Sequence, residues 1–509
     1  MTDSSGALVR CTYRRHVVGA VRGAVHCAVL GALALAVMGA CEVRAQEGSR
    51  TLSLAQSIEL AQRQSLQARA AESTRDAARR RDRAFTARRL PQLSLTGDIP
   101  AYNRAIIPVL QPDGSTEFKS QQQTDASLNL QMTQRLPFTG GSFFVSSALS
   151  RLEVNGTREL RNWSSTPLSL GLRQDILRPN SFKWDGREQD LRGEAAERQY
   201  LEAREDVAIG VTQAFFDLYT ARLDLENATR NAAVNDTLYT LNKGRFEVGK
   251  IGENDLLQSE LALLRARNSV DGARLTHDRA MAAFRLALNL PPDAPVNIAV
   301  TDVVPDLEAD TLVAVQQALR NRALTMELEL QDVQARRRIN EARLNNGIGA
   351  TLLASVGLNQ TASDVNAAYR DLLNQQRFSL ALQMPIVQWG ARSNDIQAAR
   401  ADQDRVAATS RVAREQLVQD AHFAALQLSQ SRRQLALSAK SDTVAAKRFE
   451  VAYNRYVIGR IDMDNLYLAQ NEKNQALTQY LQSLRGFWLS YYRLRRVTLY
   501  DFTTGTVIR

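Results

Sequence analysis

Residues that could carry acid–base, nucleophilic or metal chemistry are sparse in this chain of 509 residues. Beyond residue 45 only two histidines occur, His277 and His422, and neither has the neighbours or the spacing of a metal-ligand cluster. The short sequences typical of nucleotide-phosphate loops, serine hydrolases and zinc proteases are absent. Asp462 and Asp464 are close enough to suggest a carboxylate pair, but no general-acid setting accompanies them, so we interpret them as charges at the start of a helix. The sequence predicts a protein that is not an enzyme and that uses no cofactor or metal.

One short loop sequence occurs twice, and it supplies the best candidates for a functional site. VGKIGENDLL spans 248–257 and IGRIDMDNLY spans 458–467, so the copies lie 210 residues apart. Gly249 and Gly459 are natural turn residues, because glycine adopts positive φ without steric cost. A repeated turn suggests a repeated role.

Charged and apolar residues around the two glycines complete the candidate site. The basic residues Lys250 and Arg460 fit two interpretations: contacts to a partner or to an acid such as Asp464, and solvated charges on an exposed turn. Acidic residues follow in both copies, at the start of the next helical pattern. The candidate residues are Val248, Gly249, Lys250, Asp255, Ile458, Gly459, Arg460, Asp462, Asp464 and Asn465.

Long helices must position these loops. Helical patterns run from 187 to about 245 and from 392 to about 455, and about 60 residues would form a helix ~90 Å long. A second helical pattern follows each loop, with apolar residues at spacings of four and three that are typical of a coiled-coil seam. Each loop is therefore predicted to be the tip of a helical hairpin.

Strand patterns precede the long helices. Helical patterns at 51–90 and 310–344 lead into stretches of about ten residues in which apolar and polar side chains alternate, which predicts strands with one apolar face. That length suits a tilted strand of a membrane barrel, and a soluble sheet that caps a coiled coil has the same pattern. The four stretches begin near residues 92, 168, 350 and 378.

The helical patterns, the strand patterns and the loop follow one another in the same order twice along the chain, so we predict a duplicated half-domain. The first half is longer, because a further strand pair at 127–136 and 143–152 lies between its two strands. We predict that this pair is an inserted hairpin, whose strands either enter a barrel or extend an external loop. The predicted segments are 46–300 for the first half, 301–497 for the second and 498–509 for a C-terminal tail.

The first 45 residues read as an export signal. Arginines precede an apolar run of small residues, from 24 to 38, that is too short for a membrane-spanning helix. Cleavage after Ala45 fits the small-x-small rule, and the alternative is a lipoprotein box in which Cys41 is lipidated. All three cysteines lie in this segment, so a chain cleaved after Ala45 has no disulfide chemistry.

Charge argues against nucleic acid as a partner. The formal net charge is +10, and the first 45 residues, with five arginines and two acids, account for +3 of it. The basic runs at 79–81 and 336–338 have no interleaved aromatic residues, which nucleic-acid binders usually show. A solvated helical surface with excess arginine explains the balance.

The chain resembles the TolC-like outer-membrane efflux proteins, which are the outer membrane factors of tripartite efflux and type I secretion systems. The resemblance rests on LPQLSL at a helix-to-strand junction, on the two loop sequences at the hairpin tips, and on Pro179 and Pro385 where strands cross to helices. It implies a mainly α fold with a membrane β-barrel portion. In that fold, duplicated halves form a homotrimer in which four strands per subunit build a 12-stranded barrel, and a periplasmic coiled-coil tunnel continues it.

The same resemblance implies a function. Such proteins are passive ducts that contact outer-membrane lipid, close at their periplasmic tips, and open when a periplasmic adaptor links them to an inner-membrane pump. The family usually places Asp near the start of the helix after each tip; Asp255 matches, whereas the second copy has Asn465, preceded by Asp462 and Asp464. We therefore expect an export channel in the outer membrane of a Gram-negative-type cell, for small molecules or polypeptides. The alternative is a periplasmic coiled-coil scaffold that binds partners without forming a channel.

Overall fold

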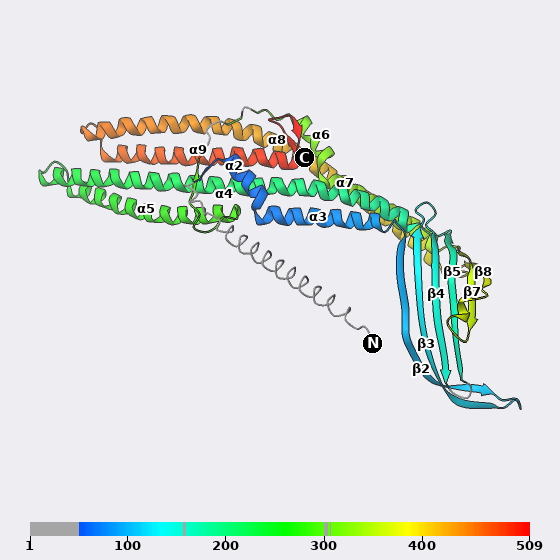
Figure 1. The fold of residues 1–509 in the computed structure, drawn as a ribbon. Coiled ribbons are helices and arrows are strands. Elements are labelled where there is room, and N and C mark those ends of the chain that lie inside the picture. Colours follow the sequence, from blue (N-terminus) through cyan, green and yellow to red (C-terminus); the bar gives the residue numbers. More distant parts are fainter. Residues whose placement is uncertain (1–49, 156–158, 300–303, 306) are drawn as a thin grey trace, which may run out of the picture. The chain divides into compact units, whose positions relative to one another are not determined.

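A computed structural model describes residues 50–155, 159–299, 304–305 and 307–509 of the chain (Figure 1). The predicted export signal at 1–45, including Cys41, lies outside the described residues. So does the predicted boundary between residues 300 and 301. A small compact unit consists of the parallel strand pair β1 (Arg50–Leu52) and β6 (Val296–Ile298) with the residues next to it.

Two helical hairpins make up most of the other unit (Figure 1). The first joins α4 (Ser181–Glu247) to α5 (Glu253–Ala287), and the second joins α8 (Ala391–Val457) to α9 (Met463–Thr498). Both α4 and α8 have 67 residues, slightly more than their sequence patterns indicate. Each repeated loop connects the two helices of one hairpin, and α4 also packs against α9. Among the described residues, no helix combines the length and the apolar character that a membrane span requires.

Two pairs of shorter helices precede the strands, and each pair replaces one continuous helical pattern. They are α2 (Leu54–Gln64) with α3 (Leu66–Ala87), and α6 (Thr311–Asn321) with α7 (Ala323–Asn345). Single extended residues separate them, Ser65 with ψ 151° and Arg322 with ψ 142°. Ser65 ends one helix and starts the next, because its N–H donates to Ala61 while its side chain accepts from the Ala68 N–H. Such a break is a local capping event that hydrophobic periodicity does not reveal.

Aromatic and aliphatic side chains pack between the long helices. Phe215 and Phe216 of α4 are almost fully buried, and their rings meet edge to face. Phe215 also meets Phe284 of α5, with ring centroids 6.0 Å apart. Full burial of one such side chain contributes about 1.5–3 kcal/mol, so this cluster holds the last turn of α5 against the middle of α4.

A single antiparallel sheet of six strands follows the order β2-β3-β4-β5-β7-β8. The hairpin expected at 127–152 lies inside this sheet, as β3 and β4, so the sheet of one chain has six strands. The four strands per subunit that the resemblance implies for the barrel stay a prediction. The loop between the last two strands contains the short 3₁₀ helix Ala367–Tyr369. The strands are β2 (Gln92–Leu110), β3 (Thr116–Arg135), β4 (Ser142–Asn155), β5 (Leu160–Ile176), β7 (Gly349–Ala362) and β8 (Leu373–Gln383).

The strands are 11 to 20 residues long, whereas the alternating pattern predicted about ten. The extra length lies mainly at the strand ends that are distant from the helices, where apolar and polar residues no longer alternate. It is mostly polar in β3, whereas β2 ends in the apolar run 105–110. In β8 the expected strand reached past Pro385, but the strand ends at Gln383, because proline cannot donate to a ladder. After α9 the chain ends in a small hairpin of β9 (Tyr500–Asp501) and β10 (Thr506–Val507).

Candidate functional site

The two loops adopt the same helix-ending geometry. Gly249 and Gly459 have φ of 72° and 73°, as expected for the turn residues. The N–H of Gly249 donates to the Phe246 carbonyl at 2.9 Å, and the N–H of Lys250 donates to the Arg245 carbonyl at 2.8 Å. This pair of hydrogen bonds defines a Schellman motif, which satisfies carbonyls that a helix end otherwise leaves unpaired.

The second loop repeats these bonds residue for residue. Gly459 donates to Tyr456 and Arg460 donates to Arg455, both at 2.9 Å. The basic residue after each glycine therefore has a backbone role in the turn, whatever its side chain contacts. The positive φ of the turn explains why glycine occurs at this place in both copies.

The loops differ where the next helix begins. Asp462 caps α9: its carboxylate accepts from the Asn465 N–H at 2.9 Å and from the Asn465 side chain at 2.7 Å. Gly252 stands at the corresponding place before α5 and has no side chain to offer. Asp255 and Asp464 lie in the first turns of their helices, where the helix dipole stabilises a negative charge. The structure confirms that Asp462 and Asp464 are charges at a helix start.

All ten candidate residues are exposed to solvent. The apolar pair Val248 and Ile458 is 67% and 64% exposed, so each tip presents an aliphatic side chain next to a basic one. Asp464 accepts a hydrogen bond from the Gln258 side chain at 3.2 Å, which joins α9 to α5. Within one chain, Asp464 thus contacts the other hairpin through an amide.

Amide side chains on the helices next to the tips also join the two helical hairpins. Asn242 of α4 accepts a hydrogen bond from the Tyr456 hydroxyl at 3.1 Å, and both side chains are buried. Asn235 accepts from the Tyr467 hydroxyl at 3.4 Å, and Asn227 donates to Asn474 at 3.0 Å. We call this set of contacts the hairpin interface: Asn227, Asn235, Asn242, Gln258, Tyr456, Asp464, Tyr467 and Asn474.

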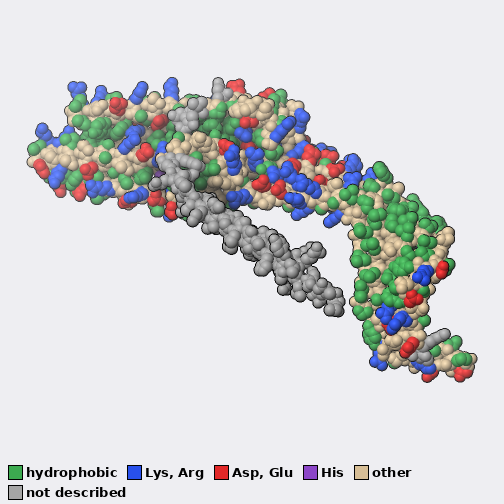
Figure 2. All heavy atoms as spheres, viewed as in Figure 1, with side chains coloured by type: hydrophobic (Ala, Val, Ile, Leu, Met, Phe, Trp, Pro, Cys, Tyr) green, Lys and Arg blue, Asp and Glu red, His purple; other side chains and the backbone are tan. Residues whose placement is uncertain are grey.

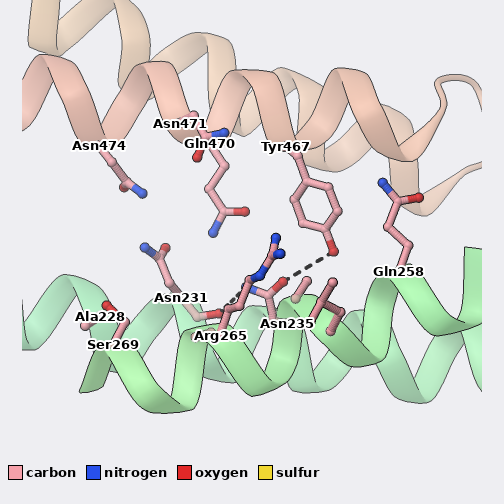
Figure 3. Close-up of a pocket in the computed structure, with 13 residues that line it drawn as sticks. Ala228, Asn231, Asn235, Gln258, Arg265, Ser269, Tyr467, Gln470, Asn471 and Asn474 are labelled. Carbon is pink, nitrogen blue, oxygen red and sulfur yellow. Dashed lines mark hydrogen bonds between the residues drawn. The ribbon is translucent and has the colours of Figure 1, made fainter. Parts of the chain in front are cut away.

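A groove of about 400 Å³ opens within the hairpin interface (Figure 3). Tyr467 and Asn474 reach into it from α9, while Asn231, Asn235 and Arg265 reach into it from α4 and α5. Burial, together with the neighbouring Tyr456, raises the pKa of Tyr467 to about 12. The Tyr467 hydroxyl therefore stays protonated near neutral pH and can donate to Asn235.

One apolar cluster closes the hairpin interface near the second tip. Leu238 of α4 packs with Tyr456, Met463 and Leu466 of the second hairpin, and all four are buried. Arg245 lies over the Tyr456 ring, 5.5 Å from its centroid. Near the tips the other contacts between the hairpins are mainly uncharged hydrogen bonds. Toward the other end of α9 they are ion pairs with α4: Arg485 with Asp217, Arg495 with Glu205 and Arg496 with Asp206.

The sheet forms a second candidate surface. Cross-strand partners place apolar side chains on one face of all six strands: Leu95 pairs with Leu130, Val145 with Leu170, and Leu168 with Leu358. The residues between them form the other face, which is mostly Ser, Thr, Asn and Gln. In Figure 2 hydrophobic side chains gather over the strands on the side of the helices, and charged side chains gather at the far strand ends. We call this surface the apolar band: Leu93, Leu95, Leu128, Leu130, Met132, Val145, Leu149, Leu168, Leu170, Leu172, Ala354, Val356, Leu358, Phe378, Leu380 and Leu382.

The apolar band spans about nine residues of a strand, for example from Leu168 to Ile176 in β5. At ~3.4 Å per residue and a tilt of ~45°, nine residues rise by roughly 20–25 Å, close to the apolar height of outer-membrane strands. Beyond the band, Glu153 pairs with both Arg151 and Arg161, and Arg151 also lies over the Trp163 ring. Charged side chains and an indole ring just beyond an apolar band are typical of a membrane–water interface.

Chemical sites of other kinds are not apparent. His277 and His422 lie on α5 and α8, and within the described ranges no group of three His, Cys, Asp or Glu side chains could hold a metal ion. No family model and no curated protein matches the chain.

Solved structures do match it. The outer membrane channel CmeC of Campylobacter jejuni aligns at a TM-score of 0.63 and 15% identity, over 89% of this chain and 86% of that one. The chain shares the fold of the TolC-like outer membrane channels. The outer membrane protein VceC of Vibrio cholerae aligns at 0.62 and 13% identity, over 88% and 96% of the two chains. The MtrE outer membrane channel of Neisseria gonorrhoeae, solved in its open state, aligns at 0.61 and 15% identity, over 90% and 89%.

Within this TolC-like fold, sequence reasoning found the tips and missed the hairpin interface. A signal for the interface was present, because Asn227, Asn231 and Asn235 recur at spacings of four on α4. Asparagine is a poor helix former, so a row of asparagines on one helix face needs a tertiary reason. Their partners on α9 are visible only in the structure.

Proposed function

We propose that the chain is the outer-membrane channel of a tripartite export system, a passive homotrimeric duct without catalysis. The strands would close into a barrel with the apolar band facing outer-membrane lipid, and the duplicated hairpins would form a tunnel in the periplasm. The observation that carries this proposal is the apolar band, which runs across every strand of the sheet in register. A soluble scaffold has no reason to expose such a surface. The fold shared with outer membrane channels supports the same conclusion.

In this proposal the tips gate the duct and receive a partner. Uncharged hydrogen bonds and one apolar cluster join the two hairpins near the tips, whereas ion pairs between α4 and α9 join them farther away. The tip ends could therefore part while the other ends stay joined. A periplasmic adaptor would dock on the exposed tips, at Val248, Lys250, Ile458 and Arg460, and on the groove of the hairpin interface. The adaptor would connect the duct to an inner-membrane pump that supplies the energy.

Single-channel conductance in planar bilayers tests the proposal, on purified protein extracted from outer membranes. We expect small currents that increase when Arg460 and Asp464 are both neutralised, as Arg460→Gln with Asp464→Asn. The matched control neutralises an ion pair inside the second hairpin, Arg448→Gln with Glu472→Gln, and should leave the current unchanged. Folded protein that stays in solution without detergent and gives no current would refute the channel and favour the periplasmic scaffold.

A further inference from the structure

The hairpin of β3 and β4 has more contacts with the sheet than an appended external loop would have. β3 pairs with β2 from Gln92↔Thr133 onward, and β4 pairs with β5 from Ser142↔Arg173 onward. The strands at the two ends of the sheet order, β2 and β8, each pair with one neighbour in the sheet. An edge with unpaired backbone groups invites pairing with another chain.

The hairpin of β3 and β4 also contributes residues to the apolar band. Leu130 and Leu128 of β3 lie level with Leu95 of β2 and Leu149 of β4, on the same face. Leu128 and Leu130 are 40% and 42% exposed. A loop that stood in water would have no reason to continue the band in register.

Hydrogen bonds fix the turn between β3 and β4, residues 136–141, to both neighbouring junctions of strand and helix. The Gln134 side chain donates to the Arg89 carbonyl at 2.7 Å, ahead of β2. The Asn180 side chain donates to the Pro137 carbonyl at 2.9 Å, and the Gln174 side chain donates to the Thr139 carbonyl at 3.0 Å. The turn is therefore held at the level where the other strands meet their helices.

The seam between the hairpin and β5 is close-packed. Gly171 lies beneath the Phe144 ring, and an added Cβ would come within 2.2 Å of it. On the other side, Gly97 of β2 approaches the Ser127 carbonyl so closely that a Cβ would lie 2.4 Å from it. At both places a glycine allows the neighbouring strand to approach closely, as is typical between paired strands of one sheet.

We propose that β3 and β4 belong to the barrel wall, so that three copies close a wall of three times six, or 18, strands instead of 12. This inference rests on the proposed trimeric duct. Barrel diameter grows roughly in proportion to strand number, so the lumen would be about 1.5 times as wide. The face of the hairpin opposite the apolar band carries Ser127, Asn129, Gln131, Ser146 and Ser150, all uncharged. The outer part of the duct therefore suits bulky hydrated solutes.

Cysteine cross-linking in isolated outer membranes tests which strands meet between subunits. The chain has no cysteine after Cys41, so introduced thiols are the reactive ones. A variant with Ser94→Cys on β2 and Ser379→Cys on β8 should give covalent trimers with a short bismaleimide. The matched variant with Ser146→Cys on β4 and the same Ser379→Cys should give none. Cross-links from β4 to β8 would show that β2 and β3 leave the wall. A cross-link within one chain between Ser94→Cys on β2 and Ser169→Cys on β5 would show that β3 and β4 leave it, because β2 would then lie beside β5. Either result would overturn the inference.

Polymer exclusion measures the lumen. Deletion of 116–155 removes β3 and β4 and leaves β2 to pair with β5, and the control replaces 105–121 by Asn-Gly, which shortens β2 and β3 but keeps six strands. Polyethylene glycols of graded size, added at the barrel mouth, should enter the natural and control channels at a larger size than they enter the deletion variant. Equal limits for all three would overturn the inference and leave the channel intact. If none of the three conducts, the proposed function fails and the inference fails with it; if only the deletion variant does not assemble, the cross-linking result decides.

Discussion

At the scale of single residues, the tips depend on glycine conformation. Gly249 and Gly459 take positive φ in open space, since no atom lies within 4 Å of the place a Cβ would occupy. A side chain there meets backbone strain alone, without a clash. The effect of a substitution should therefore be local and measurable in the turn itself.

We predict that Gly249→Ala destabilises the first tip by about 1 kcal/mol, because alanine disfavours positive φ. Hydrogen exchange of the Lys250 amide, which bonds to the Arg245 carbonyl, should become about fivefold faster. Gly244→Ala is the control: Gly244 lies within α4 with free space around it, and alanine there should stabilise the helix by up to about 1 kcal/mol. Equal exchange in both variants would contradict the role given to φ.

At the scale of elements, buried polar contacts decide how the long helices meet. The Tyr456 hydroxyl donates to Asn242, which is 1% exposed, so its loss leaves a buried amide oxygen without a donor. An orphaned buried acceptor costs about 1–3 kcal/mol. The hairpin interface bears that cost, because the two residues lie on different hairpins.

We predict that Tyr456→Phe raises the single-channel conductance, because it weakens the closed contact between the hairpins. Tyr453→Phe, on the same helix, should behave like the natural protein, since Tyr453 packs against Phe449 by its ring. The recordings would use equal amounts of trimer in the same bilayers. A current unchanged by Tyr456→Phe would mean that the hairpin interface does not hold the duct closed.

A second element-scale contact lies at the other end of α9. Arg495 pairs with Glu205 of α4 at 3.1 Å, and the Glu205 side chain is 3% exposed. Next to it, Arg496 pairs with Asp206 at 2.9 Å at the surface. Arg495→Met should lower the free energy of unfolding by about 3–5 kcal/mol, because it leaves a buried carboxylate without its cation. Arg496→Met should change it by less than about 1 kcal/mol. Denaturant unfolding of the purified protein distinguishes the two.

The pH dependence of the Arg495→Met variant follows from the same pair. Burial raises the pKa of Glu205, and Arg495 opposes that rise. Without Arg495, the folded state favours the protonated carboxyl of Glu205, whose folded-state pKa then lies above the ordinary value of 4.5. The variant should therefore be most stable below pH 4.5, and its free energy of unfolding should fall as pH rises through the folded-state pKa. A variant whose unfolding midpoint stays constant, relative to the natural protein, across that range would contradict this assignment.

At the scale of the whole molecule, the two faces of the sheet predict opposite tolerance to charge. Leu170→Arg should cost about 2–4 kcal/mol if the apolar band faces lipid, because arginine is costly at mid-bilayer depth. Ser169→Arg, one residue away on the polar face, should cost little. The amount of heat-stable trimer in outer membranes measures both variants. Equal assembly of the two would show that the apolar band does not face lipid.

The local elements could be predicted from sequence because they rest on nearest-neighbour physics. Period-3.6 and period-2 patterns indicate the long helices and the strands, and the Gly-basic pairs indicate the turns. The helix breaks at Ser65 and Arg322 were not predicted, because one extended residue leaves the surrounding apolar periodicity intact. The length of the strands was not predicted either, since apolar and polar residues do not alternate in their distal parts: the distal part of β3 is mostly polar, and β2 ends in the apolar run 105–110.

What the sequence by itself determined was the type of each element, the two tips and the export-channel resemblance, because each can be recognised from short sequence patterns and their order along the chain. The tertiary structure decided which elements meet. It placed Asn242 against Tyr456 from a distance of 214 residues, and it seated β3 and β4 within the sheet. Alternation specifies the faces of a strand but not its neighbours, because pairing depends on register between strands that only the folded chain brings together.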